Sequence, residues 1–318
     1  MVDILITPRS FGSTSSEPFD ILKKQGYTLH PNETGERYDK EQMKELIRDK
    51  DGVIIGTDPL DGEVISAARN LKVISKYGVG LDNIDLERAG AESITVTNTP
   101  DANSASVAEL AFGMIYTLAR RIAEADRKTK QGFEGKIVGS TLWSKTLGII
   151  GMGSIGRELA RRANGFNMDV HYFDIEPLSA REEQCLQVSY RPLDMLLQNS
   201  DFISLHVPLN ENTENMLGEE EFKLMKDSAL LINTARERIV EEDVLLQALE
   251  EGWIGGAGLD EFELAPGSIP ESTKDKLILT PHMGAHTGEA INNMGVTAAR
   301  NLIAALEGGD VPEENLVV

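Results

Sequence analysis

The chain has 318 residues, of which 41% are hydrophobic, so it is long enough and apolar enough for two domains that each bury a core. Its 52 acidic residues outnumber its 31 Lys and Arg residues, which gives a formal net charge of -21. Such a negative chain is a poor partner for nucleic acid or an anionic membrane, and we expect neither. The acidity favours solubility, and a saline cytoplasm would produce the same excess.

The cysteine content and the first residues exclude further classes. Cys185 is the single cysteine, so the chain has no intramolecular disulfide and no cysteine-based metal site, and we expect no metal. The sequence starts without a basic leader, and no apolar stretch is long enough to span a bilayer. We therefore expect a cytoplasmic protein.

The first hundred residues alternate short β-rich runs with helical patterns, which is typical of a parallel sheet covered by helices. Strands are predicted at residues 2–6, 27–29, 53–55, 72–75 and 94–97. Helices are predicted at residues 19–25, 40–48, 63–68 and 86–89. Together these elements predict one small α/β domain.

A long helical pattern at residues 104–129 follows and could bridge two domains. Near its start, Ser106 and Glu109 have the spacing of a capping box. The helix carries a wide apolar face that runs from Leu110 to Tyr116, and this face suits either a core or a dimer contact.

The remaining elements continue the same alternation. Strands are predicted at residues 147–150, 170–173, 202–206, 229–232, 256–259 and 277–279. Helices are predicted at residues 155–163, 193–198, 219–226, 242–250 and 289–306. Because the last helix is amphipathic, we expect it to return to the first domain. The sequence thus predicts an α/β protein with two doubly wound parallel-sheet domains, residues 1–100 with 286–318 and residues 101–285.

A glycine-rich turn lies between the strand at residues 147–150 and the helix after it. Gly151, Gly153 and Gly156 have the G-x-G-x-x-G spacing of a dinucleotide site. The first glycine permits a tight turn, the second lets the main chain approach a pyrophosphate, and the third lets the helix pack on the strand. The phosphates would then lie at a helix N-terminus, which favours anions. The alternative is an ordinary turn between a strand and a helix.

The second half of this motif is an acidic residue. Asp174 closes the next predicted strand, where a carboxylate would accept hydrogen bonds from the adenosine ribose and repel a 2′-phosphate. The position therefore favours NAD over NADP.

Four further segments follow predicted strands, at residues 76–85, 205–209, 233–237 and 280–287. Ligands bind at the carboxyl ends of strands in open α/β sheets, so these segments are candidates for a site. Their motifs are GVGLDNID (78–85), HVPL (206–209), NTAR (233–236) and TPH (280–282), and TPDANSASVAEL (99–110) and GAGLD (256–260) accompany them.

With these motifs in this order, the chain resembles the D-2-hydroxyacid dehydrogenase family, and within it the 3-phosphoglycerate dehydrogenases without their C-terminal regulatory domain. The resemblance implies a flavodoxin-like substrate domain and a Rossmann NAD-binding domain. It also implies an NAD-dependent oxidoreductase that transfers a hydride between nicotinamide and a small 2-hydroxy or 2-oxo acid. A homodimer formed through the Rossmann domain is expected.

The resemblance implies roles for individual residues. Arg236 would bind the substrate carboxylate and the C2 oxygen, and His282 would be the acid/base. The N–H groups of Val79 and Gly80 would hold the carboxylate, and Asn103 would lie near the substrate. Besides the three glycines and Asp174, the implied cofactor contacts are Ser154, Ile155, Val207, Pro208, Thr234, Ala235, Asp260 and Gly284.

Two positions depart from the family's pattern. The glutamate that normally pairs with the catalytic histidine is Ala265, so the His282 imidazole should titrate lower and be less well held. Glu237 replaces a glycine after the arginine. Glu263, Glu237 or a water could supply the missing role, with Glu263 nearest in sequence.

Three hypotheses follow: a dehydrogenase with a substitute for the lost carboxylate, a weakened dehydrogenase with an acid-shifted profile, or an NAD-binding regulatory or scaffold protein without turnover. The identity of the acid is also open. Lys76 matches one basic position of phosphoglycerate enzymes, but Gly56, Thr57 and Asp58 occupy a stretch where another arginine is common.

Overall fold

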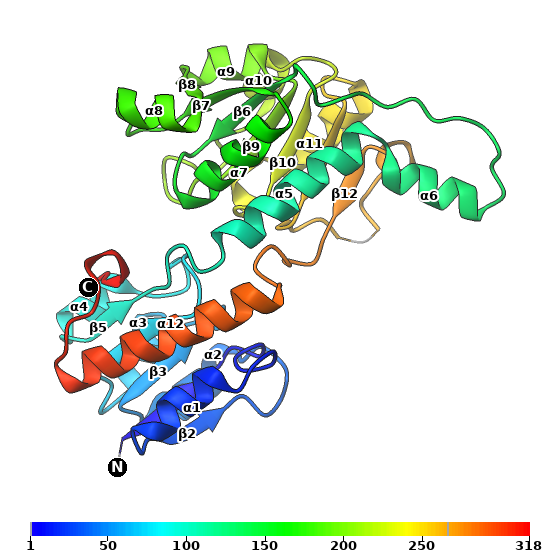
Figure 1. Ribbon diagram of the computed structural model, residues 1–318. Helices are drawn as coiled ribbons and strands as arrows, with labels where there is room; N and C mark the ends of the chain where they lie inside the picture. The colour runs from blue at the N-terminus through cyan, green and yellow to red at the C-terminus, as the bar shows by residue number, and fades with distance from the viewer. Residues whose placement is uncertain (1, 266) are drawn as a thin grey trace. The chain divides into compact units, whose positions relative to one another are not determined.

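The computed structural model describes residues 2–265 and 267–318, and it is an α/β protein with two parallel sheets, as predicted (Figure 1). The chain divides into two compact units. Unit 1 contains the residues up to 103 and those from 285 onward, and unit 2 contains residues 104–284.

The sheet of unit 1 has the strand order β2-β1-β3-β4-β5, all parallel, which is the flavodoxin-like order. Its strands are β1 (Asp3–Ile6), β2 (Thr28–Pro31), β3 (Gly52–Ile55), β4 (Val73–Lys76) and β5 (Thr95–Thr97). Its helices are α1 (Glu17–Lys24), α2 (Lys40–Ile47), α3 (Gly62–Ala67), α4 (Leu86–Ala91) and α12 (Gly288–Glu307), followed by the short 3-10 helix η3 (Glu313–Asn315).

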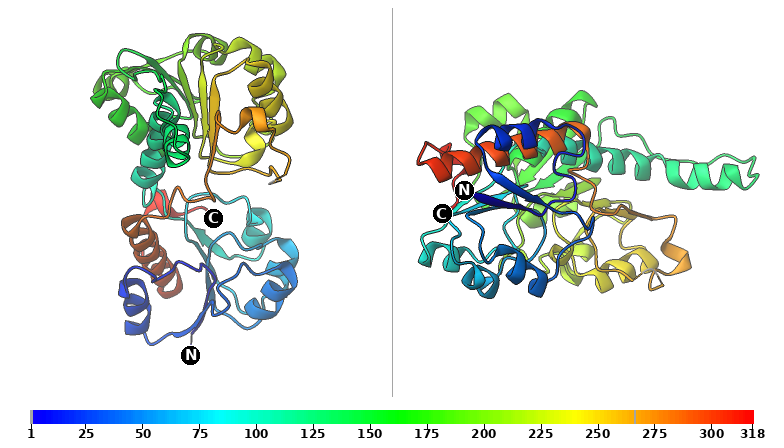
Figure 2. Two further views of the ribbon diagram at one scale, coloured as in Figure 1. Left: turned by 90° about the vertical axis from the view of Figure 1, so that its right-hand side faces the viewer. Right: turned by 90° about the horizontal axis from the view of Figure 1, so that it is seen from below.

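Helices cover both faces of this sheet. Successive strand residues point to opposite sides, so both sets of side chains are buried. Ile4 and Ile6 pack with Leu302 of α12, whereas Leu5 packs on the other face with Met43 of α2. Figure 2 shows α1 and α12 together on one face, with α2 and α3 on the other. The last helix therefore completes the core of the unit that the N-terminal strands begin.

Unit 2 has the strand order β12-β11-β10-β9-β6-β7-β8, again all parallel. Its strands are β6 (Thr146–Ile150), β7 (Asp169–Phe173), β8 (Val188–Tyr190), β9 (Phe202–Leu205), β10 (Leu230–Asn233), β11 (Gly256–Leu259) and β12 (Leu277–Leu279). Its helices are α5 (Ser104–Ala119), α6 (Ile122–Lys130), α7 (Ser154–Gly165), α8 (Ala180–Leu186), α9 (Leu193–Asn199), α10 (Glu219–Leu224) and α11 (Glu242–Glu251), with the 3-10 helices η1 (Glu237–Ile239) and η2 (Glu271–Thr273). The order reverses at β6, so the glycine turn after β6 lies at the switch point where nucleotides bind.

The helix predicted at residues 104–129 is wrong in one respect, because it breaks into α5 and α6. Arg121 adopts a left-handed conformation with φ 52° between them. The Ser140 N–H donates to the Ala119 carbonyl at 2.7 Å. The chain that returns after α6 thus occupies the carbonyl that would accept the next hydrogen bond of a continuous helix. The α8 and β8 elements were not predicted.

The expected capping box at Ser106 and Glu109 is also wrong. The helix already begins at Ser104, which places both residues inside it. The Ser106 hydroxyl donates to the Gly284 carbonyl at 2.6 Å, and Glu109 pairs with Arg162 at 2.7 Å. Both side chains tie α5 to other segments of unit 2.

Among the described residues, no helix combines the length and the apolar character that a membrane crossing requires.

Candidate functional site

The turn after β6 accepts only glycine at two of its positions. Gly151 has φ +96°, and a Cβ there would lie 2.5 Å from the His206 carbonyl oxygen at the end of β9. A Cβ at Gly156 would lie 2.2 Å from the Gly151 oxygen. These approaches are too close for any side chain, so the two glycines let β6, β9 and α7 pack together.

Gly153 differs from these two glycines, because the protein itself leaves room for a side chain there. A Cβ added there would meet no protein atom within 4 Å, so the main chain faces open space. Gly153 is the N-cap of α7, and Ser154 and Ile155 form the first turn. Their main-chain N–H groups and the positive end of the helix dipole favour an anion at this position. The arrangement fits the pyrophosphate of a dinucleotide.

Asp174 directly follows β7, and its carboxylate is fixed by two main-chain hydrogen bonds. It accepts the Met152 N–H of the glycine turn at 2.7 Å and the Glu176 N–H at 3.0 Å. The next residue, Ile175, is 88% exposed and carries no charge. A fixed anion without a basic neighbour in sequence suits ribose hydroxyls and disfavours a 2′-phosphate.

The ends of β9 and β10 supply the other predicted cofactor residues. Val207 and Pro208 follow β9, and Thr234 and Ala235 follow β10. The Thr234 hydroxyl is buried and has no hydrogen-bond partner among the described residues. Because a buried hydroxyl without a partner is costly, this atom fits a polar group of a bound cofactor.

His206, at the end of β9, was expected to be structural or adjacent to the cofactor. Burial lowers the pKa of His206 to about 3, so its ring is neutral at neutral pH. Its Nε2 lies 2.9 Å from the Ser204 hydroxyl. A neutral, buried ring does not serve as an acid at this end of the sheet.

Arg236 is held by the residues around it. Its carbonyl accepts a hydrogen bond from the Asn233 side chain at 2.7 Å, and its guanidinium donates to the Ala235 carbonyl at 2.7 Å. The side chain is 25% exposed. A partly buried, pre-oriented guanidinium is suited to planar recognition of a carboxylate.

His282 lies in the loop after β12 and has a left-handed backbone with φ 51°. Asp260, after β11, holds this loop. Its carboxylate accepts the Thr280 hydroxyl at 2.5 Å, the Met283 N–H at 2.8 Å and the Gly284 N–H at 2.7 Å. Asp260 and Gly284, both expected to contact the cofactor, are thus bonded to each other, and their roles toward the cofactor stay predictions.

A carboxylate does face His282, but it comes from Glu261. Its Oε1 lies 3.0 Å from the His282 Nε2 and 3.6 Å from the Arg236 guanidinium. The hydrogen bond to Glu261 raises the pKa of His282 above its ordinary value, against the opposing effect of burial. The expectation that the imidazole titrates lower is therefore wrong.

Sequence reasoning considered Glu263 and Glu237 in place of this residue. The Glu263 side chain is exposed, and its main-chain N–H donates to the Glu242 carboxylate. Glu261 was not predicted, because the glutamate that pairs with the histidine in the family corresponds to Ala265 in this sequence. The position of Glu261 directly after Asp260, at the carboxyl end of a predicted strand, could have identified it.

Glu237 lies in η1 and contributes indirectly. Burial raises the pKa of the Glu237 carboxyl above its ordinary value, and the charge of Glu261, to which it is hydrogen bonded, acts in the same direction. Glu237 therefore interacts with Glu261, the partner of His282, and not with His282 itself.

The residues expected to bind substrate from unit 1 have the following surroundings within that unit. The Lys76 ammonium donates to the Gly56 carbonyl at 2.7 Å and to the Asn83 side chain at 2.6 Å. Val79, in the loop after β4, is 40% exposed. Asn103 has a buried side-chain oxygen without a hydrogen-bond partner among the described residues. The roles of these residues and of Gly80 stay predictions.

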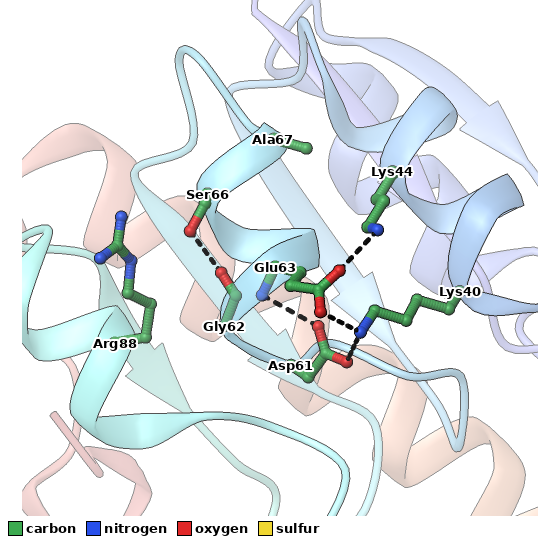
Figure 3. A pocket seen from close by; sticks show the side chains of 8 residues that line it. All are labelled: Lys40, Lys44, Asp61, Gly62, Glu63, Ser66, Ala67 and Arg88. Carbon is green, nitrogen blue, oxygen red and sulfur yellow. Dashed lines mark hydrogen bonds and ion pairs between the residues drawn. The ribbon is translucent and has the colours of Figure 1, made fainter.

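A separate hollow on unit 1 is unsuited to an anion (Figure 3). Its Lys40 pairs with Asp61 at 2.8 Å and with Glu63 at 2.9 Å, and Lys44 pairs with Glu63 at 2.8 Å. The lysines are neutralised by their own neighbours. In the part of the chain that the structure describes, no cluster of His, Cys, Asp and Glu could hold a metal ion.

Two glycine variants test the dinucleotide turn. Gly153→Ala should fold normally and weaken NADH binding about tenfold or more, because displacing the phosphate removes charge-assisted hydrogen bonds of about 1.5–3 kcal/mol each. Gly156→Ala should instead lower the melting temperature, since overpacking costs about 1–3 kcal/mol. Fluorescence titration with NADH and thermal melts measure both. Unchanged NADH affinity in Gly153→Ala would contradict the assignment.

Comparisons with known proteins agree with this geometry. Residues 112–284 match the family described as D-isomer specific 2-hydroxyacid dehydrogenase, NAD binding domain. A glyoxylate reductase of Korarchaeum cryptofilum is 42% identical over 287 residues, which are 87% of this chain and 86% of that relative. A hydroxypyruvate reductase of Thermotoga maritima is 39% identical over 299 residues, 90% of this chain and 96% of the relative.

A solved structure extends the comparison to the fold. The D-lactate dehydrogenase of Aquifex aeolicus, complexed with NAD and lactic acid, has a TM-score of 0.85 and 31% identity, and the match covers 99% of each chain. The chain therefore belongs to the D-isomer-specific 2-hydroxyacid dehydrogenase family, and it is an NAD-dependent oxidoreductase.

Proposed function

We propose that this enzyme reduces small 2-oxo acids of the glyoxylate and hydroxypyruvate class to 2-hydroxy acids with NADH. The observation that carries the proposal is the meeting of Arg236 and His282 at Glu261, 3.6 Å and 3.0 Å from its carboxylate. The arrangement supplies a cation for the substrate carboxylate and a charged acid for the C2 oxygen.

In the proposed reaction the bound cofactor supplies a hydride to C2 of the 2-oxo acid. Arg236 binds the carboxylate and orients the C2 oxygen. The His282 imidazolium donates its proton to that oxygen, so hydride and proton together give the hydroxyl group. Because the hydrogen bond to Glu261 raises the pKa of His282, the ring keeps its proton to higher pH than an ordinary imidazole would.

Two observations favour a small monoanion over 3-phosphoglycerate. The relatives above are named glyoxylate reductase and hydroxypyruvate reductase. The region around Arg236 is also acidic, since the charges of Glu261 and Glu263 both act to raise the pKa of Glu237. A dianionic phosphate near them would meet like charge. Phosphoglycerate stays a prediction and belongs in the same assay.

A regulatory or scaffold protein that binds NAD without turnover is the other candidate. Such a protein has no need to keep an imidazole charged beside a guanidinium. The structure holds His282 through both its main chain and its ring. This double restraint favours catalysis.

Turnover is the direct test of the proposal. Wild-type enzyme should oxidise NADH with glyoxylate or hydroxypyruvate, and 3-phosphohydroxypyruvate should be the poorer substrate. His282→Ala should lower kcat/KM by about a hundredfold or more, because general acid catalysis contributes about 10²–10⁴-fold. Arg236→Ala should lower it similarly, because two hydrogen bonds to the carboxylate of about 1.5–3 kcal/mol each are lost. Both variants should still bind NADH. No turnover of any 2-oxo acid by wild-type enzyme would favour the scaffold.

The raised pKa of His282 sets the sign of the pH dependence. Reduction needs the imidazolium, so kcat/KM for the 2-oxo acid should be constant at lower pH and fall only above the ordinary range of histidine. Oxidation of the 2-hydroxy acid needs the neutral ring and should rise across the same interval. Initial rates in both directions measure this. A reduction limb that falls below the ordinary histidine pKa would contradict it.

We propose further that two copies associate through unit 2. The arm, defined as α6 with residues 131–144, extends from the sheet of this unit (Figures 1 and 2). It exposes Phe133, Val138 and Trp143, with Val138 83% and Trp143 65% exposed. The arm's cations Arg127, Lys128 and Lys130 already pair with Asp275, Glu124 and Asp126 of the same chain, so the exposed apolar side chains carry this proposal. A second copy offers apolar contact to these side chains.

The association is tested by light scattering coupled to size exclusion. Wild-type protein should elute as a dimer, and the double variant Val138→Asp with Trp143→Asp should elute as a monomer of unchanged melting behaviour. Met195→Asp, at a residue 48% exposed on α9, is the matched control and should stay dimeric. A monomeric wild type, or a dimeric arm variant, would rule out this interface.

A further inference from the structure

We propose that Glu261 is the positioning residue of the catalytic histidine in this enzyme, and that it replaces from a different backbone position the carboxylate that the family carries at residue 265. The inference rests on the proposed function of His282 as acid/base and adds the residue through which that histidine acts. Glu261 itself touches neither substrate nor cofactor in this assignment.

The first support is the geometry of the carboxylate. Glu261 Oε1 lies 3.0 Å from the His282 ring, within hydrogen-bond distance, and 3.6 Å from the Arg236 guanidinium. The Glu261 side chain is only 14% exposed and the Arg236 side chain 25%, so solvent screens their pair weakly, whereas the His282 ring is 51% exposed on its other side. One carboxylate therefore orients both functional cations at once.

The second support is the rigidity of the backbone that carries Glu261. The preceding residue, Asp260, is 2% exposed, and its N–H donates to the Asn233 carbonyl at 2.9 Å. Ala265, by contrast, lies in an exposed segment. A short connection to a buried strand end fixes Glu261 better than a position farther along the exposed segment would.

The third support is that two consecutive residues, Asp260 and Glu261, hold different parts of the histidine loop. Asp260 binds the main chain of the loop that carries His282, through Met283 and Gly284, and Glu261 binds the ring. Because both carboxylates belong to residues that directly follow β11, the His282 ring and its loop are held by the same segment. Glu237, which lies in η1, is hydrogen bonded to Glu261 and so also restrains the Glu261 carboxylate.

The groups around His282 act on its pKa in opposite directions. Glu261 and Asp260 both raise the pKa of His282, whereas Arg236 and burial lower it. The net effect is upward, so removing the Glu261 charge should leave the lowering influences in place. The histidine would then lose its proton at lower pH.

The kinetic test compares Glu261→Gln with Glu263→Gln, a neighbouring carboxylate on the exposed segment. Glu261→Gln should lower kcat/KM for 2-oxo acid reduction about 10–100-fold, as loss of an orienting partner commonly does, and move the basic limb of the profile to lower pH. Glu263→Gln should change neither. Adding Ala265→Glu to Glu261→Gln should restore the limb toward wild type, because a carboxylate returns at the family's position.

A second readout does not depend on turnover. The chain has 5 histidines, so the His282 ring can be assigned in ¹⁵N-imidazole NMR spectra by comparison with His282→Gln. Titration should give a lower pKa for His282 in Glu261→Gln than in wild type, with Glu263→Gln unchanged. Glu261→Asp, which keeps the charge, should fall between them and serves if Glu261→Gln does not fold.

The outcomes separate the two proposals. A His282 titration that is identical in wild type and Glu261→Gln overturns the role of Glu261, whatever the enzyme turns over. A titration that depends on Glu261, in an enzyme that reduces none of the 2-oxo acids tested, supports the positioning role and contradicts the proposed function. NADH affinity and melting temperature of each variant should match wild type, which excludes general unfolding as the cause.

Discussion

The buried carboxylate of Asp260 is the contact on which the site depends. It accepts three hydrogen bonds from the loop between Thr280 and Gly284, two of them from main-chain N–H groups. Hydrogen bonds to a charged group contribute about 1.5–3 kcal/mol each, which is enough to hold His282 in a left-handed conformation costing about 1–3 kcal/mol. The position of His282 is thus fixed by the hydrogen bonds of neighbouring residues, in addition to the one that its own ring makes.

The same strand end places a carboxylate beside His282, although the family's usual glutamate is Ala265 here. The carboxyl ends of β10, β11 and β12 lie side by side in a parallel sheet, so Arg236, Glu261 and His282 converge although they are distant in sequence. A carboxylate from any of these strand ends can meet the other two groups. In the proposed role of Glu261, the negative charge beside the imidazole comes from a different residue than in the family's usual pattern.

The sequence predicted those features that local pattern determines. Apolar runs located most strands, and the glycine spacing located the turn that Gly151 and Gly156 occupy for steric reasons. The break at Arg121 was not visible, because it depends on a hydrogen bond between Ser140 and Ala119 across a returning arm. Glu261 was missed for a similar reason, since its partner His282 becomes its neighbour only after β11 and β12 pair.

A crystal structure of the enzyme with NADH and oxamate, which copies the carboxylate and carbonyl of a 2-oxo acid, would place these residues relative to the substrate. We expect Glu261 to remain hydrogen bonded to one nitrogen of His282, the other nitrogen to face the oxamate oxygen, and the Arg236 guanidinium to contact the oxamate carboxylate. A complex in which Glu261 turns away from His282, or in which oxamate binds without contact to Arg236 and His282, would contradict this expectation.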